Sequence, residues 1–495
     1  MNNFLLWLAA TVIVVLGALF AVPMLVDWNG YRGTFEREMT KVIGREIRIG
    51  GDVALRLLPT PYLSMEKVRI ADASGRFDTP LLRLERFTVW LSTTPLVRGQ
   101  IEAREMEFQR PELRLAFDDA GRGNWSGLGS GADFALLPSS VALSSARVVD
   151  GSLQFVLPAD RGTLLFTEVN GEVAADSLQG PFRFKGSSSF NGAGREVRID
   201  TDVFTAGGIL PVRGSMLRTG VGDTYAFDGM IAGLDGMPRA EGKLEARLPL
   251  GTAVDGPAIE LSSQLVATIE GLNLQQISLV HLHKERMQKV EGEASVGFGS
   301  RLDIALRLGG RNLDLDQLLA SRQAEPAADG VAAGGLYGKL SAIVDQLAAW
   351  MPVAADSRID ASFEQVVLAG EQLAAVAIDV RRGDGPMHLQ SLTARLPGST
   401  DLELTGDLAA TAGAVDFSGN VRVTGRNLPR LVKWIYPGAV ITTPNDPAFM
   451  IDAAVELGGE RIKLDARRAE IAGTSISGSL TFVDRPARSL DLKIA

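Results

Sequence analysis

The sequence predicts a mainly β protein, with a single N-terminal transmembrane helix followed by an elongated, curled antiparallel sheet and a few short helices. Three observations lead to this prediction. Residues 5–26 form an apolar run without a charged side chain, residues 31–43 place apolar residues at helical spacing, and from Ile47 onward apolar and polar residues alternate. Period-two alternation is typical of an antiparallel sheet with one buried and one solvated face.

The apolar run is long enough to cross a membrane. About 20 helical residues span the ~30 Å hydrocarbon core of a bilayer, and backbone in lipid must satisfy its own hydrogen bonds, which favours a helix. Trp7 and Trp28 lie near its two ends, where aromatic residues gather at membrane interfaces. We therefore expect residues 1–27 to form a membrane anchor, represented by Leu5, Trp7, Ile13, Leu16, Phe20 and Leu25.

A cleaved secretory signal is the alternative for this run. Such a signal needs a basic N-terminal region and an A-x-A-like cleavage site. Residues 1–3 carry no side-chain charge, and residues 20–23 make a poor cleavage site, so a retained anchor is favoured. The Lys and Arg residues near the run lie after it, which by the positive-inside rule would make that side cytoplasmic; the rule applies poorly before a long translocated domain.

A helix leading into a β-meander is expected after the anchor. Asn29 is the expected N-cap and Gly44 the expected C-terminal stop. Five apolar residues share one helical face: Tyr31, Phe35, Met39, Val42 and Ile43. Alternation then begins and continues to Ile70, which predicts short strands that follow the helix directly.

Strands and a few short helices account for the rest of the chain. Helices are predicted at residues 314–320, 340–350 and 428–435, from apolar stripes at helical spacing. The predicted domains are the anchor (1–27), the helix with its meander (28–128) and two sheet segments (146–321 and 336–495). The strands with the clearest apolar face supply a candidate groove: Leu244, Leu248, Leu302, Ile304, Leu306, Leu402 and Leu404.

The number of strands predicts that the sheet curls. Roughly 25 to 30 strands in one open sheet would exceed the roughly ten that twisted sheets tolerate before they curl or split. A curled sheet with an apolar concave face would form an elongated groove. An ordinary sandwich core would show the same alternation, so periodicity leaves both interpretations open.

Composition excludes several functional classes. The formal net charge of −9 and the isoelectric point near 5.2 argue against nucleic acid as a partner. Cysteine is absent, which excludes disulfides, thiolate metal sites and cysteine nucleophiles. Only three histidines occur, which nearly excludes histidine chemistry as well.

No catalytic, cofactor-binding or metal-binding residues are predicted, and the protein is not expected to be an enzyme. His281 and His283 share a strand face, but no third ligand is evident, so a solvated strand face is favoured. Asp314 and Asp316 lie at i and i+2 and do not face each other on a helix, so one of them is expected to be a cap or turn carboxylate rather than part of a general acid–base pair.

The chain resembles the AsmA family of bacterial envelope proteins. Near the N-terminus the resemblance rests on Trp28, Tyr31, Gly44-Arg45, Ile47, Gly51, Val53, Leu55, Leu58-Pro59, Pro61, Leu63 and Val68. Further pieces follow in order: GRGNW at 121–125, DGSLQF at 150–155, SLQGPFRFKG at 177–186, NLDLDQLLA at 312–320, LTARLPGSTDLELTG at 392–406 and AGTSISGSL at 472–480. The resemblance implies a repeating β-groove of the kind found in bridge-like lipid carriers, an N-terminus in the cytoplasm and the bulk of the chain in the periplasm.

Three functions are compatible with these features. The first is a protein anchored in the bacterial inner membrane by a single span, whose β-groove carries or shields phospholipid or another envelope lipid for outer-membrane homeostasis. The alternative is a scaffold or assembly factor for outer-membrane proteins that acts through exposed strand edges. An anchored enzyme is the third, and it would need paired carboxylates in a cleft. The first is the function that the sequence favours.

Overall fold

The computed structural model describes residue 7 and residues 26–494, apart from 59, 95–102, 119–120, 127–142, 158–161, 176–179, 206–207, 235, 251–256, 284–285, 323–334, 412–413, 439–447, 459–460 and 484–488. All of the predicted anchor residues except Trp7 lie outside this set. Within the described residues, no helix is both long and apolar enough to cross a membrane.

The chain divides into two compact units, which we describe separately. Unit 1 comprises residues 1–244 and 266–269, and unit 2 comprises residues 245–265 and 270–495. The domain boundaries expected from the sequence stay predictions.

The described part of unit 1 is built from strands with one helix at its start. Its elements are the 3₁₀ turn η1 (Trp28–Tyr31), helix α2 (Arg32–Ile43), β1 (Ile47–Ile49), β2 (Val53–Arg56), β3 (Tyr62–Ile70), β4 (Leu82–Leu91), β5 (Ala103–Gln109), β6 (Glu112–Ala116), β7 (Leu143–Val156), β8 (Thr163–Ala175), β9 (Phe182–Phe190), β10 (Ala193–Thr201), β11 (Leu210–Arg218) and β12 (Thr224–Ala232). Strands β13 (Arg239–Pro249) and β14 (Ala258–Ala267) contribute residues to both units.

Helix α2 packs on the first strands as its apolar spacing predicts. Phe35, Met39 and Ile43 contact a core cluster of Ile47, Ile49, Val53, Met65, Val68 and Leu84. Gly44 ends the helix in the left-handed region (φ 74°), as expected, because glycine lacks the Cβ that disfavours this conformation.

The predicted N-cap of α2 is wrong. Asn29 lies inside η1, whose N-cap is Asp27, and the Asn29 side chain instead accepts a hydrogen bond from the Val53 amide at 3.0 Å. The N-cap of α2 itself is Tyr31, which makes no side-chain capping hydrogen bond, because the capped 3₁₀ turn directly precedes the helix. Tyr31 is exposed rather than part of the buried helix face.

The sheet of unit 1 curls, as a contact across it shows. Strands β6 to β12 pair in sequence order, so a flat sheet would separate β6 from β12 by about 29 Å, at ~4.8 Å per strand. Trp125, which follows β6, nevertheless donates its indole N–H to the carbonyl oxygen of Leu234, just after β12, at 3.0 Å. The sheet must therefore bend back on itself. Its pairings are antiparallel except that β7 runs parallel to β5 and β6.

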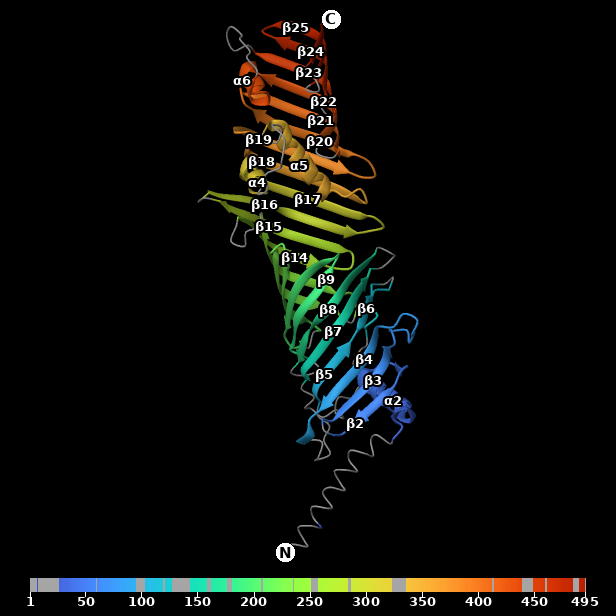
Figure 1. The fold of residues 1–495 in the computed structure, drawn as a ribbon. Helices are drawn as coiled ribbons and strands as arrows, with labels where there is room; N and C mark the ends of the chain where they lie inside the picture. The colour runs from blue at the N-terminus through green and yellow to red at the C-terminus, as the bar shows by residue number, and fades with distance from the viewer. Residues whose placement is uncertain are drawn as a thin grey trace. The chain divides into compact units, whose positions relative to one another are not determined.

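The described part of unit 2 is a second long run of strands joined by three helices (Figure 1). Its elements are β15 (Gly271–His283), β16 (Arg286–Phe298), β17 (Leu302–Asp314), α4 (Leu315–Arg322), α5 (Leu336–Trp350), β18 (Ala355–Leu368), β19 (Glu371–Arg382), β20 (Met387–Leu396), β21 (Thr400–Thr411), β22 (Ala414–Gly425), α6 (Leu428–Ile435), β23 (Phe449–Gly458), β24 (Arg461–Ile471), β25 (Thr474–Val483) and β26 (Ser489–Ile494). The mainly β fold with a few short helices, three of them at the predicted places, is confirmed.

Strands β15 to β26 pair in sequence order, and every pairing is antiparallel except β17–β18, which is parallel. Parallel neighbours need a crossover connection, because a tight turn can only reverse the chain. Helices α4 and α5 lie in that crossover. Nothing in the alternation of apolar and polar residues indicates this parallel pair, because successive side chains alternate between the two faces in parallel and antiparallel pairing alike.

Pairs of glycines covered by phenylalanine recur in both units. Gly171 faces Gly186 across β8–β9, and Gly406 faces Gly419 across β21–β22. The phenylalanine two residues earlier, Phe184 or Phe417, lies against the glycine, so a Cβ on Gly419 would meet the Phe417 ring at 2.6 Å. Aromatic cover of this kind fills the space that a glycine leaves in a bent sheet.

We expect Gly419→Ala to lower the free energy of unfolding by about 1–3 kcal/mol, the usual cost of overpacking. Its Cβ would also lie 2.0 Å from the carbonyl oxygen of Thr405, a backbone atom that cannot move without bending the strand. Urea denaturation of the full chain would measure this. Gly385→Ala is the matched control, because nothing lies within 4 Å of a Cβ there. Equal stability of the two variants would contradict the role assigned to the glycine pair.

Candidate apolar binding surface

Unit 2 has one apolar and one charged face. On the charged face, ion pairs connect neighbouring strands: Arg358 pairs with Asp379 at 3.2 Å, and Arg422 bridges Glu403 and Asp452 at 3.3 and 3.0 Å. The opposite side chains of the same strands are aliphatic or aromatic. We call this side the apolar face of unit 2, and the strand register makes it continuous from β15 to β25.

The structure brings several predicted groove residues together on this face. Leu306 lies between Ala294 and Ile359 on the neighbouring strands, and Leu404 lies between Leu392 and Val421. Leu306 and Leu404 pack against the same core cluster: Val344, Met351, Ile359, Val380, Met387, Leu389, Leu408, Val415 and Phe417.

The other predicted groove residues lie in different surroundings. Leu402 packs against a second cluster that includes Val366, Leu396 and Phe449. Ile304 is half-buried on the same face of β17 as Leu306, and Leu302 at the start of that strand is 40% exposed. Leu244 and Leu248 are half-buried on β13, the first in unit 1 and the second in unit 2.

Helices cover part of the apolar face. Helix α5 inserts Val344, Leu347, Ala348 and, just past its end, Met351 into the first cluster, while Leu315 of α4 and Leu431 of α6 enter the second. Figure 1 shows α4 and α5 in front of the strands. Here the apolar face is a closed core, which the alternation in the sequence could not distinguish from an open groove.

Several apolar side chains of β15, β16, β24 and β25 are less enclosed. Those of β24 and β25 on this face, Ile462, Leu464, Ile476 and Leu480, are half-buried, as are Leu272 and Leu274 of β15 and Val296 of β16. None of these seven residues is a member of the clusters that the helices enter. These stretches are the candidate binding surface.

The carboxylate of Asp316 connects helix α4 to the start of α5 and to the β18–β19 turn. Asp316 of α4 accepts hydrogen bonds from Lys339 of α5 at 2.7 Å and from the amides of Ala369 and Gly370, in the β18–β19 turn, at 2.9 and 2.7 Å. Burial alone would raise the pKa of Asp316, but these hydrogen bonds outweigh it and hold the pKa below its ordinary value. Asp314 caps α4 through the Gln317 amide at 2.9 Å. The sequence predicts that one of these two carboxylates is a cap or turn residue, and Asp314 is that cap.

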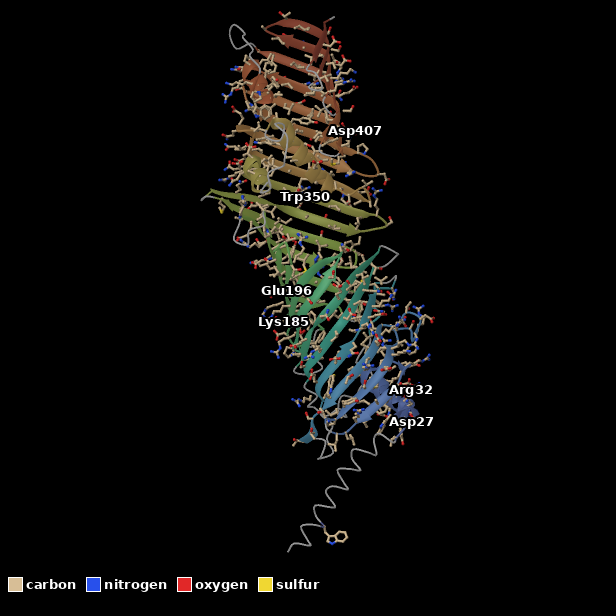
Figure 2. All side chains as sticks on the ribbon, viewed as in Figure 1. Asp27, Arg32, Lys185, Glu196, Trp350 and Asp407 are labelled. Carbon is tan, nitrogen blue, oxygen red and sulfur yellow. The ribbon has the colours of Figure 1, made fainter. Side chains whose placement is uncertain are left out.

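Arginines satisfy the carbonyl groups at the other end of α5. Arg382 donates to the Met351 carbonyl oxygen at 2.6 Å, and Arg301 donates to that of Val353 at 2.7 Å. Positive charge at a helix C-terminus also interacts favourably with the helix dipole. Helix α5 is therefore held at both ends, while Trp350, labelled in Figure 2, remains half-exposed to solvent.

An open cavity of about 420 Å³ lies where β21, β22, β23 and β24 end. Leu408, Phe417 and Leu457, which belong to the first cluster or pack against it, line its apolar part. Its charged lining is Asp407, Asp416, Glu456, Arg461 and Lys463. Among these charges, Asp407 contacts His388 at 2.7 Å, and Glu456 and Lys463 contact each other at 3.5 Å. The cavity offers an amphiphile an apolar floor and a charged rim.

The prediction of a solvated His281 is wrong. His281 is only 4% exposed, and its Nδ1 lies 3.2 Å from the carbonyl oxygen of Ala258. Its strand neighbour Gln288 is also buried and donates to Gln317 of α4 at 2.7 Å. The crossover helix covers this part of the strands, and local alternation cannot report such a contact. The described residues contain no group of three or more potential metal ligands.

Unit 1 has a comparable two-sided region in β9–β12. One face carries charged residues, among them Lys185 and Glu196, labelled in Figure 2, and the ion pair of Arg198 with Asp200 at 3.2 Å. The strand register places apolar residues on the other: Phe182, Phe184, Val197, Ile199, Val212, Met216, Phe227 and Ile231. We call this the apolar face of unit 1. The sequence analysis did not single it out, although the alternation in FRFKG signals it.

The comparisons with known proteins identify the beginning of the chain. The model of the AsmA family matches residues 1–148, which include η1, α2, β1–β6 and the first residues of β7. The resemblance derived from the sequence is thus confirmed over this part. No curated protein and no solved structure matches the chain. The family match and the large sheets fit an envelope-associated protein.

We expect Asp316→Asn to lower the free energy of unfolding by about 1–3 kcal/mol near neutral pH, because Lys339 and two amides lose a charged acceptor. A carboxyl whose pKa is lowered on folding stabilises the fold above its ordinary pKa, 3.8 here, and loses that effect as the pH falls through the folded value. The difference between wild type and variant should therefore shrink in acid.

Thermal denaturation at several pH values would measure this difference. Asp345→Asn is the control, because Asp345 is an exposed carboxylate on helix α5, the helix whose Lys339 donates to Asp316, and it should leave the melting temperature unchanged. A pH-independent difference between wild type and Asp316→Asn would refute the assigned role.

Proposed function

We propose that this chain is an AsmA-type envelope protein, anchored in the inner membrane with its bulk in the periplasm, that carries or shields lipid acyl chains on its apolar sheet faces. The observation that supports the proposal most directly is the row of half-buried apolar side chains on β24 and β25, outside the helix-covered clusters. Contiguous apolar surface that is left partly open marks an interaction site.

The energetics of such binding require no special residue. Each CH₂ group removed from water contributes about 0.8 kcal/mol, so an acyl chain gains affinity simply from the length of apolar surface that it covers. The twelve strands β15 to β26 of unit 2 extend over about 50 Å at ~4.8 Å per strand. The cavity of about 420 Å³ lies within the range of small-molecule sites.

This function involves binding and no covalent reaction, so we propose that the protein is not an enzyme and needs no cofactor. Its proposed partners are the inner membrane and a phospholipid or other envelope lipid. A scaffold for outer-membrane proteins is the competing hypothesis, which predicts a folded protein without bound lipid.

We expect the full chain, purified in detergent from bacterial envelopes, to retain lipid in near-stoichiometric amount by native mass spectrometry and lipid extraction. Leu480→Asp places a charge on the apolar face of β25 and should remove most of this lipid, because burying an unpaired carboxylate is unfavourable.

Thr481→Asp is the matched control. It adds the same charge one residue further along, on the opposite face, where Lys463 is the strand neighbour. Circular dichroism would verify that both variants fold. A folded, lipid-free wild type would refute the proposed function and favour the scaffold; equal lipid retention by both variants would refute the assigned surface.

A further inference from the structure

Two arginines interrupt the apolar face of unit 1. In β9–β12 the strand register places the other charged side chains, those of Arg183, Lys185, Glu196, Arg198, Asp200, Arg213 and Asp228, on the charged face. Arg195 of β10 and Arg218 of β11 lie on the apolar face and are directly opposite each other in the register. Like charges in this position destabilise a sheet, so the arrangement calls for a compensating negative charge.

The protein supplies only part of that compensation. Arg218 pairs with Asp223 at 2.5 Å, and the Asp223 side chain is largely buried. Arg195 makes no ion pair with a described residue: its guanidinium lies over the Phe190 ring at 5.2 Å and contacts the carbonyl oxygen of Ala193 at the limiting distance of 3.5 Å. The two arginines and Asp223 together leave one positive charge uncompensated.

Further polar groups surround the pair. The Nε of Arg218 is buried and has no hydrogen-bond partner within the described structure. Ser188, also buried, lies opposite Arg195 on β9, and Tyr225 lies close to Asp223 on β12. Burial raises the pKa of the Tyr225 hydroxyl, and the charge of Asp223 and a hydrogen bond with it raise this pKa further, so the hydroxyl stays neutral and donates to the Asp223 carboxylate.

Beyond the arginines the same face is apolar. Val197 and Met216 occupy the adjacent row, followed by Ile199 and Phe227. Along β11 the strip from Arg218 to Leu210 measures about 26 Å at ~3.3 Å per residue. A cationic, hydrogen-bonding end joined to an apolar strip complements a molecule with an anionic head and a hydrocarbon tail.

We propose that Arg195 and Arg218 bind the phosphate-bearing head group of an amphiphile whose tail lies on the apolar face of unit 1. Planar guanidinium groups match phosphate oxygens by paired hydrogen bonds, which the compact ammonium group of a lysine does not. This inference rests on the proposed function and names the class of ligand, an anionic amphiphile, for the part of the surface that lies in unit 1.

Three probes test the inference by equilibrium dialysis against the full chain in a non-ionic detergent below its micellar concentration. Decyl phosphate carries tail and head group, decanol carries the tail alone, and inorganic phosphate carries the head group alone. We expect decyl phosphate to bind more tightly than either of the others. Ionic strength of about 1 M, where the Debye length is about 3 Å, should weaken its binding and leave that of decanol unchanged.

Arg195→Gln with Arg218→Gln should lower the affinity for decyl phosphate at least about tenfold, as expected for the loss of charge-assisted hydrogen bonds. The affinity for decanol should stay unchanged. The matched control, Arg198→Gln with Arg213→Gln, removes two arginines from the same two strands on the charged face and should change neither affinity. If the double variant fails to fold, Arg195→Gln alone serves, because Arg195 has no carboxylate partner whose burial it supports.

The outcomes separate the inference from the proposed function. Decyl phosphate and decanol of equal affinity, or equal losses in the arginine variant and its control, would overturn the head-group site while apolar binding persists. Inorganic phosphate that binds as tightly as decyl phosphate would show a free-anion site and also overturn it. If neither decyl phosphate nor decanol binds, the proposed function itself fails.

Discussion

Successive side chains of a strand point to opposite faces, and this single constraint organises both units. Apolar and charged residues alternate in strands such as β18, for example at Arg358, Ile359 and Asp360. The charged face of such a strand is solvated, and the apolar face must be covered by other parts of the protein or bind an apolar ligand. A register slip of one residue would exchange the two faces, so the pairing is strongly specified. At irregularities such as the one between Ala466 and Ala469 on β24, the alternation of side chains shifts along the strand, yet apolar residues still occupy the apolar face.

The apolar face of unit 2 has two parts, one covered by helices and one left partly open to solvent. The parallel pair β17–β18 forces a crossover connection, and the crossover supplies α4 and α5, which cover the strands beside them. Away from the helices, the side chains of β24 and β25 are only half-buried. A stable core and an open binding surface thus share one sheet, and the proposed lipid binding uses the part that the helices leave open.

Polar groups on the apolar faces are informative because burial makes them costly unless they are paired. Asp316 and Gln288 have protein partners that join α4 to its surroundings, which explains why they are tolerated. Arg218 has one carboxylate partner, whereas Arg195 lies over the Phe190 ring and makes no ion pair with a described residue, which is why the two arginines point to a ligand. The match to the AsmA family ends at residue 148, before these arginines, so this inference depends on the chemistry of the chain itself.

The sequence by itself determined the features that depend on neighbouring residues. The strand alternation, three short helices, the stop at Gly44 and the capping carboxylate Asp314 follow from spacing and local chemistry. Only the tertiary structure decided that α5 closes part of the apolar face, that His281 is buried, and that Arg195 lies opposite Arg218. These facts join residues that are distant in the chain. Periodicity reports which face a side chain occupies, whereas strand register and helix docking decide what that face meets.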